Sequence, residues 1–214
     1  MTLETWTLDG TRSGIRFSVR HLLLAKISGR FARWGGSVQV EGAEIDFTSL
    51  ELAADTASID TGLARRDLYL RSLHFLNVGA YPYLTFAGRR VDKGRDDRLR
   101  VVGELTILGG TREVSLDVDD CVRSRDPDGT EHASFSLKAS VDRREFGLIW
   151  HRAVHSRAAL LSDHVDIDLD VDAARTTALE QVPERDQPLA SRERRAAYAH
   201  ADLAPWPETS IEAG

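Results

Sequence analysis

Histidines are the residues in this sequence with the most evident capacity for metal chemistry. His151 and His155 are four positions apart, and His164 follows them. On a helix this spacing would place two imidazoles on one face, where they could bind zinc. The segment around them has the composition of a loop between strands, however, and no Glu follows His151 as it does in zinc proteases. We therefore predict no metal site, and an enzyme that uses these three histidines is the alternative.

Other signatures of catalysis are missing from the sequence. It contains no Gly-x-Ser-x-Gly elbow, no Walker loop and no Gly-x-Gly-x-x-Gly fingerprint. Cys121 is the only cysteine and has no obvious base near it, so it can form neither an intrachain disulfide nor a cysteine-based zinc site. We predict no catalytic residue and no cofactor.

Positive charge is dense in the stretch 58–86, which interrupts a series of strand-like segments. Arg66 and Arg71 lie there on either side of Asp67. Guanidinium groups bind phosphate and carboxylate oxygens in bidentate fashion, so Arg66 and Arg71, with His21, could meet the polar head group of a ligand. The alternative is a local ion pair between Arg66 and Asp67 on a solvated helix face.

Composition limits the class of protein. The 214 residues are 42% hydrophobic, which is ample for a core, and the formal net charge of -6 disfavours a nucleic-acid partner. No window approaches 18 apolar residues, and the N-terminal residues lack the basic and apolar regions of a secretion signal. We expect a soluble, cytoplasmic protein without an integral membrane segment.

Alternating apolar and polar residues predict a chain of strands. The alternation recurs in the following segments: 14–20, 27–31 and 38–40 as a hairpin around Gly35-Gly36, 50–53, 83–88, 99–107, 114–119, 134–141 and 165–172. Between two of them Asp60 and Thr61 are N-cap types, the next ten residues suit a helix, and Pro82 forbids its continuation. Short connections and one apolar face per strand predict an all-β fold, an antiparallel β-barrel of about eight strands with one short helical crossing.

The composition changes near residue 175. Beyond it the alternation ends, and Ala, Arg, Glu and Pro predominate. We predict a barrel domain over residues 1–174 and a C-terminal extension over 175–214. The extension is expected to be disordered or to contain one short helix at 189–201.

Several fragments in fixed order identify a family resemblance. They are Trp6-x-Leu8-Asp9, Ser13-x-Ile15-x-Phe17-Ser18-Val19-x-His21-Leu22, Ser58-Ile59-Asp60-Thr61, Arg66-Asp67-x-x-Leu70-Arg71, Tyr81-Pro82-x-Leu84-Thr85-Phe86, Gly103-x-Leu105-Thr106-Ile107 and Arg143-x-x-Phe146-Gly147. Over roughly residues 4–174 the chain resembles the YceI-like family, lipocalin-like barrels that bind polyisoprenoid and related lipids. The resemblance implies that the barrel encloses a cavity.

The resemblance also implies a function, which is to hold or carry a long polyisoprenoid or acyl lipid without performing chemistry on it. Inward-facing residues are then candidates for ligand contact: Phe17, Val19, Phe31, Phe86, Leu105, Ile107, Phe135, Leu137, Phe146 and Trp150. The alternative is that these side chains fill a small barrel, which would then act as a protein-interaction module. The sequence leaves open whether two barrels pair as a homodimer.

Overall fold

The computed structural model of the chain describes residues 3–21, 25–41, 46–94, 98–149 and 161–175. Its elements are β1 (Leu3–Leu8), β2 (Gly14–His21), β3 (Ala25–Phe31), β4 (Trp34–Glu41), β5 (Asp46–Asp55), η1 (Thr56–Ser58), β6 (Ile59–Asp60), α1 (Ala64–Arg71), β7 (Tyr83–Lys93), β8 (Leu99–Ile107), β9 (Gly110–Arg125), β10 (Glu131–Asp142), η2 (Arg143–Phe146) and β11 (Leu161–Arg175). None of the described helices is long and apolar enough to span a bilayer.

The described residues belong to the first of two units into which the chain divides, residues 1–179 and 180–214. The second unit lies outside the described residues, and so does the helix expected at 189–201. The domain boundary after residue 174 therefore stays a prediction.

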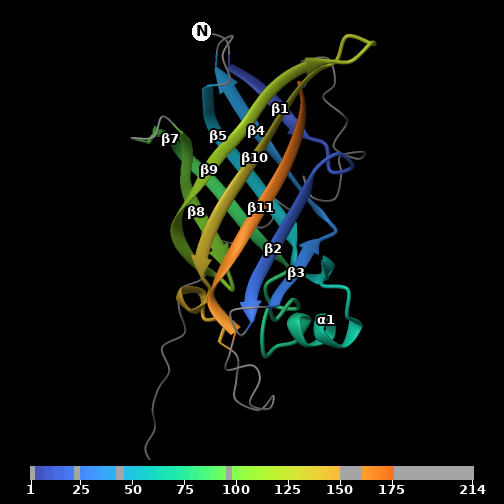
Figure 1. Cartoon of the computed structure of the whole chain (residues 1–214), viewed down its shortest axis with the longest axis vertical. Helices are drawn as coiled ribbons and strands as arrows, with labels where there is room; N and C mark the ends of the chain where they lie inside the picture. Colours follow the sequence, from blue (N-terminus) through green and yellow to red (C-terminus); the bar gives the residue numbers. More distant parts are fainter. Residues whose placement is uncertain (1–2, 22–24, 42–45, 95–97, 150–160, 176–214) are drawn as a thin grey trace, which may run out of the picture. The chain divides into compact units, whose positions relative to one another are not determined.

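Eight strands form a closed antiparallel ring in the order β1, β4, β5, β7, β8, β9, β10 and β11 (Figure 1). The ring closes where β11 pairs with β1, with Trp6 opposite Arg175 and Leu8 opposite Ala173. Each strand of the ring has a neighbour on both sides, which removes the exposed edges of an open sheet. The predicted all-β fold, an antiparallel barrel of about eight strands with one short helix, is confirmed.

β11 is long enough to pair with two strands on the same side. Its C-terminal residues pair with β1, whereas residues 165–170 pair with β2. β3 pairs with β2 in turn, and the short β6 pairs with β3. These strands extend the wall toward the end of the barrel at which α1 lies (Figure 1).

Alternation determines which side chains point into the barrel. On β11, Leu169 and Val171 are buried, whereas Asp170 between them is exposed and pairs with Arg16 of β2. Successive side chains of a strand point to opposite faces, so the aliphatic residues of β11 form its inner row. This period of two is the signal that predicted the strands.

The half of the barrel farther from α1 is filled by side chains. Trp6, Val38 and Leu50 come from the neighbouring strands β1, β4 and β5, and each is at most 1% exposed. Leu137 of β10 is buried completely. The large indole of Trp6 packs with Val38 and Leu50 in the close-packed core at this level, whereas Leu137, opposite Leu169, lies nearer the middle of the barrel.

A buried polar cluster stabilises the closure of the ring. Nδ1 of His132 lies 2.8 Å from a carboxylate oxygen of Asp172, and its Nε2 lies 3.1 Å from Asp126. Ser134 donates a hydrogen bond of 2.9 Å to Asp172, and Arg12 approaches the same carboxylate at 3.4 Å. Buried charges persist where they have such partners, so the cluster links β10, β11 and the turn after β1.

The helical crossing begins later than the sequence predicts. The N-cap residue of α1 is Leu63, whose side chain makes no capping hydrogen bond, so the cap assigned to Asp60 and Thr61 is wrong. Instead, Asp67 in the first turn accepts hydrogen bonds from the backbone N–H of Thr61, at 3.0 Å, and from its hydroxyl. A carboxylate in the first turn also complements the helix dipole, which explains how α1 begins without a side-chain cap.

Candidate ligand-binding cavity

The half of the barrel next to α1 contains a cavity of about 590 Å³. Its lining is almost entirely aliphatic and aromatic, and Leu63, Tyr69 and Leu70 contribute from the side of α1. Among the described residues, the lining includes no carboxylate, histidine or cysteine. Small-molecule sites typically measure about 300–1,000 Å³ and are mostly apolar, so the cavity has the size and character of such a site.

Several of the residues singled out from the sequence come together in this lining. They are Phe17, Val19, Phe31, Arg66, Phe86, Leu105 and Ile107. The rings of Phe17 and Phe31 lie 5.6 Å apart between centroids. A Cβ on Gly29, opposite Phe17 in β3, would lie 2.4 Å from the Cζ of that ring, so the glycine leaves room for Phe17 to lie against the wall.

Three other residues predicted to face the cavity are buried elsewhere. Phe135, Leu137 and Phe146 are at most 4% exposed, yet they are not part of the lining. On β10 the residue that lines the cavity is Val141, farther along the strand toward η2. Alternation assigned Phe135 and Leu137 to the inner face correctly but carries no information on their level along the barrel axis.

Arg71 does not line the cavity either. Its guanidinium donates a hydrogen bond of 2.6 Å to the carbonyl of Ile59, which ties the end of α1 to β6. His21 is the last residue of β2, and its side chain lies outside the described part of the structure, as does Trp150. That any of the predicted residues binds a ligand stays a prediction.

Arg65 and Arg66 bring positive charge to the lining. Nε and a terminal nitrogen of Arg66 each donate a hydrogen bond of 2.7 Å to Thr61, whose hydroxyl and backbone N–H are in turn bonded to Asp67. The local ion pair between Arg66 and Asp67 is thus not formed. Neither arginine has a carboxylate within ion-pair distance among the described residues, so each retains N–H groups for an oxygen-rich ligand group.

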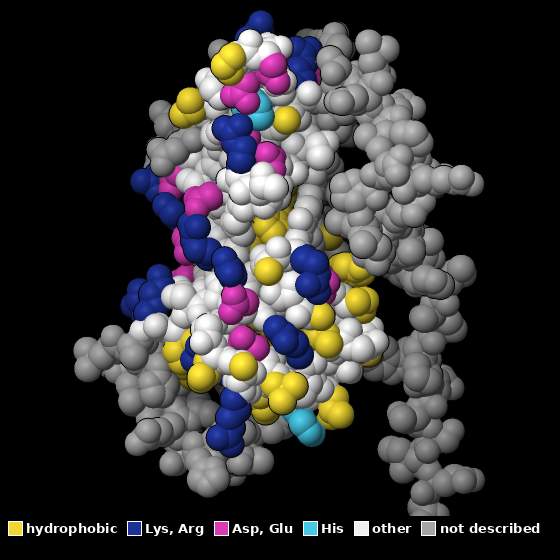
Figure 2. All heavy atoms as spheres, turned by 90° about the vertical axis from the view of Figure 1, so that its right-hand side faces the viewer, with side chains coloured by type: hydrophobic (Ala, Val, Ile, Leu, Met, Phe, Trp, Pro, Cys, Tyr) yellow, Lys and Arg dark blue, Asp and Glu magenta, His cyan; other side chains and the backbone are white. Residues whose placement is uncertain are grey.

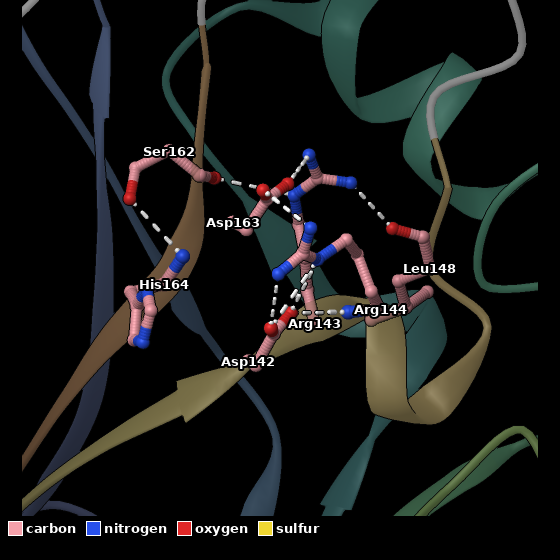
Figure 3. A network of polar contacts seen from close by, with 7 residues as sticks. All are labelled: Asp142, Arg143, Arg144, Leu148, Ser162, Asp163 and His164. Carbon is pink, nitrogen blue, oxygen red and sulfur yellow. Dashed lines mark hydrogen bonds and ion pairs between the residues drawn. The ribbon is translucent and has the colours of Figure 1, made fainter.

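Figure 3 shows the polar network that borders the cavity at η2. Arg143 lines the cavity and is 8% exposed, and a terminal nitrogen lies 2.7 Å from Asp163. The same guanidinium donates to the carbonyls of Leu148, at 2.6 Å, and Ser162, at 3.2 Å. Because a buried guanidinium requires such partners, Arg143 acts as a structural residue that holds η2 against the start of β11.

Asp142 anchors the same network from the end of β10. It accepts hydrogen bonds from the backbone N–H of Arg144, at 2.9 Å, and from the Arg144 side chain, at 2.7 Å. The Arg144 side chain, and then its backbone N–H, lower the pKa of Asp142 from 3.8 to about 2. Arg144 also reaches Asp163, at 3.1 Å, and so joins Asp142 to the network of Arg143.

His164 and Cys121, the described groups among those considered for catalysis, are not part of the cavity lining. No group of three or more His, Cys, Asp or Glu is placed to hold a metal ion in the described part of the chain. His164 is exposed, whereas His151 and His155 lie outside the described residues, and the alternative of a histidine site stays a prediction. Partial burial raises the pKa of the Cys121 thiol, which disfavours the reactive thiolate.

Comparison with known proteins agrees with this architecture. A UPF0312 protein of Vibrio cholerae is 30% identical over 164 residues, which cover 76% of this chain and 82% of that protein. A UPF0312 protein of Staphylococcus aureus is 29% identical over 169 residues, or 78% of this chain and 95% of that protein.

Two solved structures share the fold. The YCEI protein of Campylobacter jejuni has a TM-score of 0.64 at 25% identity, and the alignment covers 74% of this chain and 90% of that one. A polyisoprenoid binding domain from Saccharophagus degradans has a TM-score of 0.58 at 17% identity and covers 82% of this chain and 100% of that one, a likeness of fold alone. The sequence profile of the YceI-like domain matches residues 6–173, and the chain therefore belongs to the YceI-like family.

Proposed function

We propose that this protein binds a long apolar molecule in its cavity and holds or carries it without chemical change. The observation that carries the proposal is the lining of the cavity, which is aliphatic and aromatic except for a few residues such as Thr61, Thr85, Arg65 and Arg66. Such a surface releases water when it receives a hydrocarbon chain, and this release is the main favourable term in apolar binding.

Chain length then sets the affinity. Each buried CH₂ group contributes about 0.8 kcal/mol, so roughly ten carbons supply ~8 kcal/mol before the costs of association are subtracted. A short hydrocarbon would therefore bind weakly, and a polyisoprenoid or a long acyl chain is the better ligand. The name of the domain from Saccharophagus degradans supports the isoprenoid among these.

The polar end of the ligand is assigned to the side of α1. Arg66 lines the cavity there and has no carboxylate partner among the described residues, and Arg65 lies beside it. A head group with phosphate, carboxylate or carbonyl oxygens could accept hydrogen bonds from the N–H groups of these arginines while the apolar chain occupies the cavity. Arg71, also suggested by the sequence, is engaged by the carbonyl of Ile59, and the part suggested for His21 stays a prediction.

The absence of chemistry is supported by what lines the cavity. General bases are most often His, Asp, Glu, Lys or Cys, and the described lining contains none of these types. Its hydroxyl groups, on Thr61, Thr85 and Tyr69, therefore have no such base beside them in the lining to activate them as nucleophiles. Metal analysis of protein purified without a histidine tag tests the alternative. One equivalent of bound metal would favour the site at His151, His155 and His164.

A filled-cavity variant tests the binding itself. Val114 and Val122 are both on β9, but Val114 lines the cavity and Val122 is 58% exposed. Val114→Trp should weaken binding of a fluorescent prenyl or acyl probe about tenfold or more, because the indole occupies part of the hollow, and Val122→Trp should leave it unchanged. Lipid extraction and native mass spectrometry of the purified protein should recover a long-chain lipid. No lipid and no saturable probe binding would overturn the proposal.

A further inference from the structure

Exposed leucines lie on α1 and at both of its ends. Leu63, Leu68 and Leu73 are 54%, 71% and 72% exposed. Figure 2, in which the α1 end of the barrel is lowest, shows hydrophobic side chains gathered at this end. Exposed apolar patches of this kind mark interaction surfaces. We call the surface formed by Leu63, Arg65, Leu68 and Leu73 the docking face.

The segment that carries the docking face is positively charged, although the chain as a whole has a net charge of -6. Between residues 61 and 81 it contains Arg65, Arg66 and Arg71. Asp67 is the single carboxylate of this segment, and it is buried and bonded to Thr61. Exposed leucines next to the exposed Arg65, with the adjoining Asp60 already paired with Arg30, match the surface of a bilayer that contains anionic lipids.

The docking face is continuous with the cavity. Leu63 and Arg65 are both exposed and both contribute to the cavity lining. A bilayer in contact with this face would therefore adjoin the apolar interior, and a long-chain molecule could pass between them with little exposure to water. This continuity gives a lipid surface a direct route to the cavity, and we therefore favour a lipid surface over a protein partner.

We propose that the α1 end of the barrel docks on an anionic lipid surface. Leu68 and Leu73 insert among the acyl chains, and Arg65 remains in the layer of phosphate head groups. The proposal extends the proposed function, because it names the place where the ligand enters and leaves, but the docking itself does not require that a ligand be bound.

Flotation with vesicles tests the docking. The wild-type protein should bind vesicles of phosphatidylcholine and phosphatidylglycerol in equal parts more strongly than vesicles of phosphatidylcholine alone. The double variant Leu68→Ser/Leu73→Ser should lower the partition coefficient at least about tenfold, since two largely exposed leucines no longer insert. Arg65→Gln should lower it about fivefold at low salt and less at high salt.

Two substitutions at other places serve as matched controls. Val122→Ser removes an exposed aliphatic side chain from β9 near the β9–β10 hairpin, which lies at the opposite end of the barrel (Figure 1). Lys93→Gln removes one exposed positive charge at the end of β7. Both should bind the mixed vesicles as the wild type does, and circular dichroism should confirm that all variants are folded.

Binding of a fluorescent prenyl probe in vesicle-free solution separates this proposal from the proposed function. The double variant should bind the probe as tightly as the wild type, because Leu68 and Leu73 do not line the cavity. If the wild-type protein does not bind anionic vesicles, or if the double variant binds them equally well, the docking proposal is wrong. The proposed binding of a ligand in the cavity would not be affected. Sedimentation showing instead a homodimer that the double variant abolishes would also overturn the docking proposal.

Discussion

Arg66 and Arg71 are five positions apart, yet their surroundings differ. Arg66 lines the cavity, and its bonds to Thr61 hold the guanidinium in place while leaving other N–H groups unused. Arg71 lies outside the lining and donates to the carbonyl of Ile59. The first arginine is placed to contact a ligand, whereas the second links α1 to β6.

Substitution of the two arginines should separate these roles. Arg66→Gln should weaken binding of a prenyl phosphate about tenfold or more, since a hydrogen bond to a charged group contributes about 1.5–3 kcal/mol. Binding of the uncharged prenyl alcohol should change little. Arg71→Gln should lower the free energy of unfolding with smaller effect on either ligand, as measured by urea denaturation and isothermal titration calorimetry.

Two results would contradict this assignment. Equal loss of affinity for the phosphate and the alcohol would show that Arg66 shapes the cavity and does not bind the head group. A loss of stability in Arg66→Gln with unchanged phosphate binding would show that its bonds to Thr61 are its main contribution.

At the scale of elements, η2 is held by contacts between residues that are far apart in the sequence. Arg143 and Phe146 were recognised as parts of a motif, but the partner of Arg143 is Asp163 on β11, 20 residues away. No local pattern indicates such a pairing, because it depends on how β10 and β11 are aligned. The start of α1 was missed for a related reason, since Asp67 bonds to Thr61 across the turn and replaces the expected cap.

The Asp142 carboxylate should make the stability of the protein around η2 depend on pH. Its pKa is lowered from 3.8 to about 2 in the folded protein, so the folded state favours the ionised form. This contribution is fully present above about pH 4 and is lost as the pH falls toward 2. The difference in free energy of unfolding between the wild type and Asp142→Asn should therefore be largest near neutral pH and shrink between pH 4 and 2.

Urea denaturation at a series of pH values measures this difference. Arg144→Gln should reproduce part of the pH profile, because the Arg144 side chain is the largest cause of the lowered pKa and the backbone N–H of residue 144 remains. A difference that stays constant from neutral pH to pH 2 would mean that Asp142 acts only through its neutral hydrogen bonds.

At the scale of the whole molecule, the sequence predicted the barrel but not the distribution of space inside it. Inward-facing side chains follow from the period of two, and the closed antiparallel ring follows from the short connections. Whether an inward side chain meets others across the barrel depends on strand tilt and register. For that reason the sequence does not distinguish Phe17 and Leu105, which line the cavity, from Leu137, which is completely buried but outside the lining.

The division of the barrel into a filled half and a hollow half implies that its backbone does not open uniformly. Strands β9, β10 and β11 each run through both halves, so the backbone amides of a single strand should exchange their hydrogens at very different rates. Hydrogen exchange should be slow around Leu137, where opening breaks the close-packed core, and faster around Val141, beside the cavity. A bound lipid should slow exchange selectively around Val141, so that the exchange rates at the two ends of β10 become more similar. Uniform protection along β10 in the lipid-free protein would show that the barrel opens as one cooperative unit.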